Sequence, residues 1–379
     1  MKTNNTPRRA LRAALLVAAL ATAPMAAEVH AEWNSNLILN GGAESATGGD
    51  GSYLANSLPG WAVSGELTAI SYELGGPAGY PTSTDPGPAD RGANLFGGGY
   101  AGLSRGTQTI SLDFASGSIN GAGAYFSLSG WLGGYGSQND NATLSVTYLD
   151  AANNVIGTHS VGPVLASERD NATAMLYRES AGWVPMGATS ALVELSMSRT
   201  GGSSNDGYAD NLALSLAPAN VQLSAPTTAG IGATFDVTVA LMSPFGGVYG
   251  ADELLAFGFD LGFDTSLLKL ANVSVAAPWD DDSAFFDDVN VAGSVFESIT
   301  DQGQESLQLA TLTFEVLAVG EVFIDIHSNA GNLNHGLTYL NGENANLFGR
   351  TSVALVPEPG TWLMMGAGLL ILFLRRRNA

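Results

Sequence analysis

The sequence of 379 residues contains no cysteine. This absence excludes disulfide bonds, thiolate metal sites and a cysteine nucleophile. Helical periodicity is also almost absent between the two ends of the chain. Short apolar runs alternate there with turns rich in glycine, of which the chain has 48. Such a pattern is typical of all-β folds. Without disulfides these folds are expected to be held by their cores, and a bound metal would add to this stability.

Basic residues are scarce as well. Lys and Arg number 14 against 35 Asp and Glu, which gives a formal net charge of −21, and half of the basic residues lie in the two terminal segments. A surface this acidic repels phosphate backbones and anionic headgroups, which excludes binding to nucleic acid and peripheral binding to membranes. It favours divalent cations and solubility outside the cell.

The first 31 residues are predicted to be a secretory signal peptide. Basic residues precede a short apolar run, Ala13–Ala23, and Val29-His30-Ala31 supplies a small-x-small cleavage site. The alternative, an N-terminal membrane anchor, is disfavoured because the run is shorter than the ~20 residues of a membrane span. The basic residues are Lys2, Arg8, Arg9 and Arg12.

The last segment, residues 356–379, has three parts in a fixed order. Pro357-Glu358-Pro359 is followed by the apolar run Trp362–Leu374 and then by Arg375, Arg376 and Arg377. As a helix, this run is about 20 Å long against a hydrocarbon core of about 30 Å. It is therefore predicted to be a short transmembrane helix with a cytoplasmic basic end.

This order resembles the PEP-CTERM sorting tail of Gram-negative bacteria that make exopolysaccharide. The resemblance implies recognition of Pro357, Glu358 and Pro359 by an exosortase, a membrane transpeptidase thought to remove the helix. An ordinary single-span anchor is the alternative. Either way, the rest of the chain is expected outside the inner membrane, in the cell envelope, on the surface or in the extracellular matrix.

Between these ends, the pattern predicts two consecutive β-sandwich domains of jelly-roll type, at residues 32–217 and 221–355, with a break after Pro218. Leu144, Val146 and Tyr148 alternate with polar residues and are expected to share a buried face. The strands expected in the first domain are residues 37–39, 107–114, 125–131, 142–149, 155–160, 191–198 and 211–216, and those in the second are 235–241, 256–264, 309–316 and 320–324.

The first domain resembles galactose-binding-like jelly rolls, which include many bacterial carbohydrate-binding modules. The likeness rests on residues 36–44, which read NLILNGGAE, and on residues 208–216, which read YADNLALSL. In that family the first and last strands lie side by side, often with a structural calcium between them. The resemblance implies Glu44 and Asp210 as Ca²⁺ ligands; solvated acids beside turns are the alternative.

Aromatic residues of the first domain fall into two groups. Tyr80, Tyr100 and Tyr135 lie in glycine-rich loops, where exposed rings are able to stack on sugar rings of an extracellular polysaccharide. Sequence alone does not place the three loops on one face. Tryptophans are expected to fill the core instead, because large aromatic rings dominate sandwich interiors. These are Trp61, Trp131 and Trp183.

The second domain resembles a cohesin-like domain. The likeness rests on residues 235–239 (FDVTV), 257–264 (FGFDLGFD) and 309–316 (LATLTFEV). Cohesins bind dockerin modules, but the chain has no dockerin repeat. Asp280–Asp282 and Asp287-Asp288 are expected to be solvated loops, with a cation site as the alternative.

The one match to a catalytic motif lacks the structural context that the motif requires. Gly102-Leu-Ser-Arg-Gly106 matches G-x-S-x-G, but it leads into a strand rather than a helix, unlike a nucleophile elbow. We therefore expect an exported, non-catalytic protein that binds carbohydrate or mediates adhesion. A hydrolase acting on extracellular polysaccharide and a structural matrix protein without a ligand are the alternatives.

Overall fold

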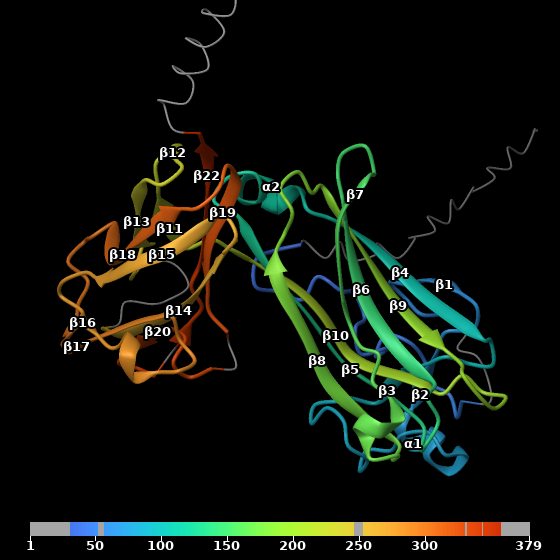
Figure 1. Ribbon diagram of the computed structural model, residues 1–379. Helices are drawn as coiled ribbons and strands as arrows, with labels where there is room; N and C mark the ends of the chain where they lie inside the picture. Colours follow the sequence, from blue (N-terminus) through green and yellow to red (C-terminus); the bar gives the residue numbers. More distant parts are fainter. Residues whose placement is uncertain (1–30, 52–56, 246–252, 330–331, 343, 358–379) are drawn as a thin grey trace, which may run out of the picture. The chain divides into compact units, whose positions relative to one another are not determined.

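The computed structural model describes residues 31–51, 57–245, 253–329, 332–342 and 344–357. The predicted signal peptide lies outside these residues, apart from Ala31, and so do Glu358, Pro359, the helix 362–374 and Arg375–Arg377. Within the described ranges, no helix is long and apolar enough to cross a membrane. The described chain is all-β, with four sheets in two pairs, as predicted (Figure 1).

The first sandwich consists of the first ten strands and holds a large apolar core between its two sheets. One sheet has the order β1-β4-β9-β6-β7 and the other β2-β3-β10-β5-β8. The strands are β1 (Ala62–Ser64), β2 (Thr68–Ser71), β3 (Asn94–Gly97), β4 (Leu103–Ser111), β5 (Ala124–Gly134), β6 (Asn141–Leu149), β7 (Val155–Val161), β8 (Ala174–Trp183), β9 (Ser190–Ser198) and β10 (Gly207–Pro218). Its helical turns are α1 (Tyr72–Gly75), η1 (Gly76–Ala78), η2 (Asp113–Ala115), α2 (Ser116–Ile119) and η3 (Ala166–Arg169).

The alternating pattern predicts the buried faces correctly, since Leu144, Val146 and Tyr148 on β6 are all fully buried. The strand expected at residues 37–39 is wrong, because this segment forms turns and bends. It nevertheless runs along β10, where the Leu37 N–H donates to the carbonyl of Leu214. Asn40, at φ 52°, shows why the segment is irregular; a left-handed residue interrupts an extended strand.

The sheet that contains β10 also covers a smaller apolar cluster on its outer face, away from the main core. Trp131 on β5 belongs with this cluster and is only partly buried, so its expected place in the main core is wrong. Trp61 lies in the main core and Trp183 is also buried. The cluster consists of Ile70, Tyr72, Leu95, Met175 and Tyr208, with Tyr80 and Trp131 packed against it.

The second sandwich consists of the strands from β11 onward and has its own core. A four-stranded sheet, β11-β13-β18-β15, faces a sheet with the order β12-β22-β19-β14-β17-β16, to which β20 and β21 are attached beside β14. The strands are β11 (Val221–Ser224), β12 (Thr228–Gly230), β13 (Thr234–Met242), β14 (Leu254–Phe263), β15 (Leu268–Val275), β16 (Asp280–Asp281), β17 (Val291–Ile299), β18 (Ser306–Val316), β19 (Gly320–His327), β20 (Gly336–Tyr339), β21 (Asn344–Ala345) and β22 (Phe348–Val356), with one helical turn, η5 (Ser283–Phe285).

The strands expected in this part are found at β13, β14, β18 and β19. Leu312, Phe314 and Val316 on β18 are buried, as their alternation predicts. Phe257 and Phe259 on β14 are buried in the same core. The alternation of apolar residues was therefore a sound guide to the inner face of both sandwiches.

Candidate functional site

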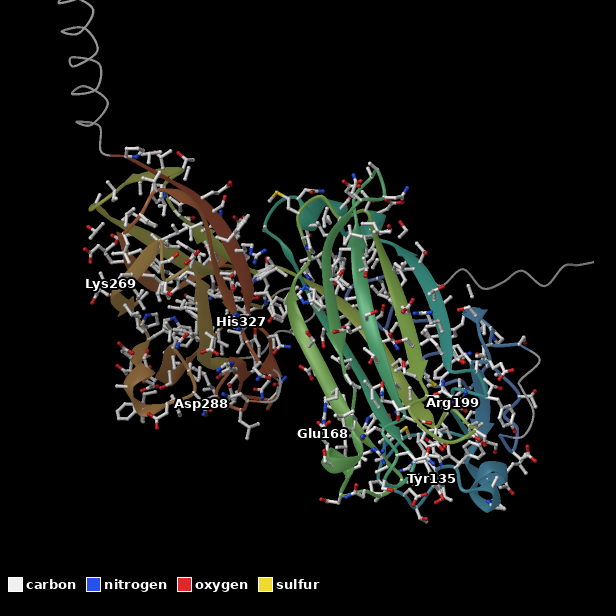
Figure 2. All side chains as sticks on the ribbon, turned by 45° about the vertical axis from the view of Figure 1, so that its right-hand side comes forward. Tyr135, Glu168, Arg199, Lys269, Asp288 and His327 are labelled. Carbon is white, nitrogen blue, oxygen red and sulfur yellow. The ribbon has the colours of Figure 1, made fainter. Side chains whose placement is uncertain are left out.

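A small pocket of about 160 Å³ lies among the loops of the first sandwich. Two of the three predicted tyrosines, Tyr80 and Tyr135, line it together, although they are far apart in the sequence. Figure 2 shows Tyr135 and Arg199 at the same loop end of this sandwich. We call this site the tyrosine pocket. Its lining residues are Ala78, Gly79, Tyr80, Tyr135, Ser204, Asp206 and Tyr208.

Arg169 holds the loop that carries Tyr135 through hydrogen bonds to the loop backbone, and its side chain is almost fully buried. The guanidinium donates to the backbone carbonyls of Gly136 at 3.1 Å and Gln138 at 2.9 Å, and also to that of Ala172. Burial lowers the pKa of Arg169. Because the guanidinium binds carbonyls, its hydrogen bonds order the loop instead of neutralising a carboxylate.

The loop that carries Ser204 and Asp206 is fixed by Asp140, which is fully buried. One carboxylate oxygen of Asp140 accepts hydrogen bonds from the Thr200 N–H at 2.6 Å, the Thr200 hydroxyl at 3.0 Å and the Gly201 N–H at 3.1 Å. The other accepts from the Asp206 N–H at 3.0 Å. Asp140 is thus a structural residue, and its hydrogen bonds hold Asp206 at the pocket.

Two tyrosines form the inner wall of the pocket. The rings of Tyr80 and Tyr208 meet edge to face, with centroids 6.0 Å apart. The Tyr80 hydroxyl donates to the carbonyl of Gly51 at 3.2 Å. Gly51 has φ +82°, and a Cβ there would lie 2.1 Å from the Tyr80 ring. A glycine is therefore required where the backbone meets this ring.

Tyr135 forms the outer wall and is 40 % exposed. A Cβ added at Gly79 would lie 3.4 Å from the Tyr135 ring, so the ring stands directly against the glycine backbone of the facing loop. Tyr100 is similarly exposed, at 43 %, but does not line the pocket. The structure therefore brings together two of the three predicted tyrosines and leaves the third beside them.

Asp206 is the charged residue of the pocket lining, and the sequence analysis did not select it. Burial raises its pKa, and the neighbouring carboxylate of Asp140 adds to the rise. The Tyr208 hydroxyl donates to Asp206 at 3.2 Å, which opposes the rise. Asp206 lies directly before β10, and no pattern in the sequence marks it as a residue that faces a cavity.

The second predicted site is the acid pair Glu44 and Asp210, of which Asp210 lies on β10 and Glu44 lies in a turn. Both oxygens of Glu44 accept from the Ala93 N–H at 3.1 Å, and one also accepts from the Asn94 N–H at 2.9 Å. Asp210 is fully buried and accepts from the Tyr72 hydroxyl at 2.6 Å. The structure therefore fixes both carboxylates.

These two carboxylates are close enough to influence each other. Burial raises the pKa of Asp210 to about 7, and the charge of Glu44 adds to the rise. Gly42 lies between them, since a Cβ there would be 3.4 Å from both Asp210 Oδ1 and Asn211 Oδ1 and 3.6 Å from Glu44 Cγ.

Within the described ranges, no group of three or more His, Asp or Glu residues forms a metal cluster. An ion at the acid pair would therefore need amide and backbone oxygens as further ligands. Asn211, at φ 46°, lies where the register between β10 and β5 shifts, and such a bulge turns its side chain out of the strand pattern. Glu44 and Asp210 both already accept hydrogen bonds from the protein, and the calcium site that the sequence resemblance implies stays a prediction.

The outer sheet face offers a second aromatic surface that the sequence analysis missed. Trp131 on β5 and Tyr177 on β8 lie opposite each other, with ring centroids 5.9 Å apart. Tyr177 is 46 % exposed, and its hydroxyl donates to Glu179 at 2.8 Å. This pair is an alternative platform for a flat ligand, but no pocket among those described is lined by it.

Ser104 has the environment of a structural residue. It lies within β4 and is fully buried. Its hydroxyl donates to the carbonyl of Gly98 at 2.7 Å and accepts from the Glu66 N–H at 3.0 Å. A nucleophile elbow requires an exposed serine between a strand and a helix, so the G-x-S-x-G match is coincidental, as the sequence analysis expected.

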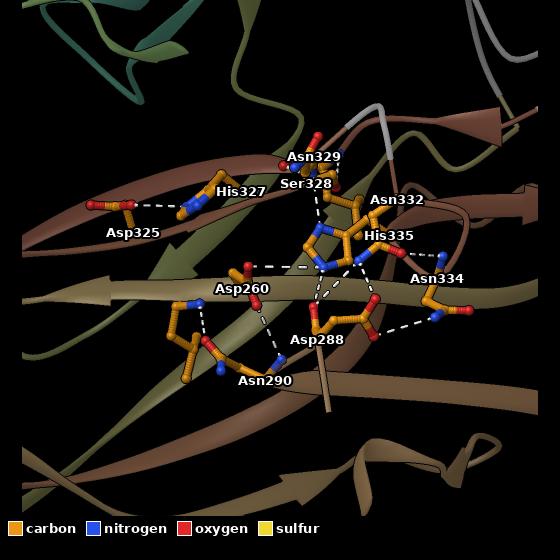
Figure 3. Close-up of polar contacts among 12 residues, drawn as sticks. Asp260, Asp288, Asn290, Asp325, His327, Ser328, Asn329, Asn332, Asn334 and His335 are labelled. Carbon is orange, nitrogen blue, oxygen red and sulfur yellow. Dashed lines mark hydrogen bonds and ion pairs between the residues drawn. The ribbon is translucent and has the colours of Figure 1, made fainter. Parts of the chain in front are cut away.

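The second sandwich contains a polar cluster around His335, whose side chain is nearly fully buried (Figure 3). His335 Nδ1 accepts from the Asn329 N–H at 2.9 Å, so Nε2 carries the proton that it donates to the carbonyl of Asp288 at 2.8 Å. We call Asp260, Asp288, Asn332, Asn334 and His335 the histidine cluster.

Asp288 accepts hydrogen bonds from other side chains of the protein. It is one of the acids for which a cation site was the alternative interpretation. Its carboxylate accepts from the Asn332 amide at 2.8 Å and from the Asn334 amide at 3.3 Å. Asp260 accepts from the Asn290 N–H at 3.2 Å. These contacts join the loop before β17 to β14 and to the loop before β20, which indicates a structural role.

Comparison with known protein families finds a match at the C-terminal end of the chain. Residues 355–377 match the PEP-CTERM protein-sorting motif. The predicted sorting tail is confirmed. The motif implies that an exosortase processes the chain and that the protein is exported to the envelope or surface. A search of curated proteins found no significant relative.

Solved structures of carbohydrate-binding modules and of a cohesin module are similar to parts of the chain. A "Family 16 Carbohydrate Binding Module-2" is 20 % identical over 47 % of this chain and 99 % of its own length, with a TM-score of 0.30. The module TmCBM61, solved in complex with β-1,4-galactotriose, is 13 % identical over 48 % of this chain and 97 % of its own, with a TM-score of 0.29. A cohesin module from a Clostridium perfringens family 33 glycoside hydrolase is 9 % identical over 37 % of this chain and 97 % of its own, with a TM-score of 0.29.

Proposed function

We propose that this protein is an exported, non-catalytic protein that binds carbohydrate through the tyrosine pocket of its first sandwich. The observation that supports this proposal most strongly is the meeting of Tyr80 and Tyr135 around Asp206. Tyrosine rings offer flat apolar surfaces to the C–H faces of a sugar, and a carboxylate accepts hydrogen bonds from its hydroxyl groups.

The size of the pocket limits the ligand. Its volume of about 160 Å³ is below the ~300–1,000 Å³ of sites for drug-sized ligands. It therefore suits one sugar ring, such as the end or a branch of a polysaccharide. The loops around it are held by Asp140 and Arg169, so the walls are formed before a ligand arrives, which lowers the entropic cost of binding.

Hydrolysis is disfavoured by the same geometry. Glycoside hydrolases use two carboxylates on either side of the scissile bond. Asp140, whose charge acts on Asp206, is fully buried and accepts four hydrogen bonds from the protein. Asp140 therefore has no access to a substrate and is unsuited to act as the second catalytic carboxylate.

The test of the binding proposal is a glycan array probed with the full-length protein in detergent, followed by calorimetry with any saccharide that binds. Tyr135→Ala is expected to weaken binding at least tenfold, because it removes one wall of the pocket. Tyr100→Ala is the matched control, since Tyr100 is as exposed but lies outside the lining. Equal losses in both variants, or no saccharide bound, would contradict the proposal.

We further propose that the sorting tail is removed in the host and that the mature protein resides in the envelope or exopolysaccharide matrix, where the second sandwich supports adhesion or contact with a partner. Mass spectrometry of the mature protein should show residues 362–379 missing. Replacement of Pro357, Glu358 and Pro359 by alanine should leave them attached. An intact tail on the wild-type protein at the cell surface would contradict this part of the proposal.

A further inference from the structure

We propose that the tyrosine pocket selects a cationic amino sugar, one whose amine is free and protonated, over neutral, N-acetylated or acidic sugars. This inference rests on the proposed carbohydrate function and names the class of ligand. It follows from three features of the pocket: which hydrogen-bonding groups are already used, which charges face the cavity, and how large the cavity is.

The hydrogen bonds within the pocket leave mainly acceptors for a ligand. The Tyr80 hydroxyl donates its hydrogen to the Gly51 carbonyl, and the Tyr208 hydroxyl donates its hydrogen to Asp206. Both oxygens therefore retain only lone pairs. Asp206 is an acceptor as a carboxylate, the hydroxyl groups of Ser204 and Tyr135 can donate or accept, and none of the lining side chains carries an N–H group. An ammonium group, with three donors and no acceptor, complements this set.

The charge of the pocket points the same way. Asp206 is partly removed from water, and the side chain that donates to it is the neutral hydroxyl of Tyr208. A carboxylate in such a place is more costly to keep charged than one in water, and a ligand ammonium offsets this cost. A sugar carboxylate would instead be repelled by Asp206 and by the neighbouring Asp140.

Arg169 does not neutralise the pocket. It lies behind the Tyr135 loop, and its guanidinium is committed to the carbonyls of Gly136, Gln138 and Ala172. It is not a lining residue, so Asp206 is the one charged side chain among the described residues that line the cavity. A cation next to the rings of Tyr80 and Tyr135 gains a further attraction to their π faces.

N-acetylation opposes binding in two ways. It removes the positive charge, and it adds an acetyl group to a ring that must fit a cavity of about 160 Å³. The preference for the free amine is therefore expected at equal ring geometry, which makes the glucosamine and N-acetylglucosamine series the sharpest pair of probes.

The experiment is calorimetry of the full-length protein in detergent with four tetrasaccharides: those of glucosamine, N-acetylglucosamine, glucose and galacturonic acid. The glucosamine tetramer should bind at least ~10-fold more tightly than the neutral ones, and the galacturonic acid tetramer should not bind. Asp206→Asn should remove the preference for glucosamine. Asp113→Asn, which removes an exposed acid elsewhere on the same sandwich, should retain it.

The other possible results distinguish failure of the amino-sugar inference from failure of the proposed carbohydrate function. Tight binding of a neutral tetramer that survives Asp206→Asn would overturn the amino-sugar inference but leave the carbohydrate function in place. Glucosamine binding that survives both Asp206→Asn and Tyr135→Ala would show attraction to the acidic surface as a whole, and would overturn the inference. Binding of none of the four, together with a blank glycan array, would overturn the proposed function as well.

Discussion

The tyrosine pocket of the first sandwich and the histidine cluster of the second are both polar sites next to loops, but they differ in how their polar atoms are used. In the histidine cluster, His335 and Asp288 bind to other groups of the protein (Figure 3). In the tyrosine pocket, Asp206 faces a cavity and receives one hydroxyl donor. A polar group satisfied by the protein stabilises the fold, whereas one facing a cavity is available to a ligand.

The acid pair, Glu44 and Asp210, is a third polar site. Calcium binding there is expected to have the largest effect on stability. We expect calcium to stabilise the first sandwich through Glu44 and Asp210, by about 2.7 kcal/mol at a hundredfold excess over its Kd. Glu44→Gln and Asp210→Asn should each remove most of this gain. Hydrogen exchange of the full-length protein with calcium or chelator measures it, and protection should rise in β3 and β10.

The second sandwich is the internal control for this experiment, because the proposed calcium ligands Glu44 and Asp210 both lie in the first sandwich. Exchange in β14 and β18 should not respond to calcium. A response there, or a calcium effect that survives both substitutions, would move the metal site to other acids. The absence of any response in the wild-type protein would remove the site.

His335→Ala tests the structural role of the histidine cluster. It leaves the Asn329 N–H and the Asp288 carbonyl without their buried partner, and should lower the free energy of unfolding by about 1–3 kcal/mol. Denaturant unfolding followed by fluorescence measures this change. Saccharide binding should be unaltered; a loss of binding with unchanged stability would reverse the roles assigned to the two sites.

Neighbouring acids give a finer test. Asp288→Ala should destabilise the protein by about 1 kcal/mol, because the amides of Asn332 and Asn334 lose their acceptor. Asp287→Ala, one residue away and exposed, should have almost no effect. Equal changes in the two melting temperatures would show that charge, rather than these hydrogen bonds, determines the result.

The smallest effect is expected at Asp206 and has the opposite sign. Because its pKa is raised in the folded protein, the native state holds the proton more tightly than the unfolded chain. Its contribution to stability is therefore present below the ordinary carboxyl pKa and is lost as pH rises through the raised value. Asp206→Asn should slightly raise the melting temperature at pH 7.5 and leave it unchanged near pH 3. A lower melting temperature at neutral pH would identify Asp206 as a stabilising residue instead.

Alternation along single strands predicted much of the fold. It identified β6, β13 and β18 and their inner faces, because one face of each strand packs on a core. It missed β8, where Arg178 and Glu179 occupy a strand whose outer face meets solvent. It also misplaced Trp131, since alternation does not distinguish the two faces of a sheet that both carry apolar residues.

The tyrosine pocket was predictable only in part. Glycine-rich loops singled out Tyr80 and Tyr135, but their meeting depends on loop conformations held by Asp140 and Arg169 through distant contacts. No local pattern encodes such contacts. Asp206 lies before β10 at a position where a turn acid is the ordinary interpretation, and only the fold shows that it faces a cavity.

The most direct test of the central claim is an experimental structure of the protein with a saccharide that it binds. The account predicts one sugar ring between Tyr80 and Tyr135, with a hydrogen bond to Asp206. A sugar lying instead on the outer sheet face, across Trp131 and Tyr177, would contradict the assignment of the tyrosine pocket as the binding site.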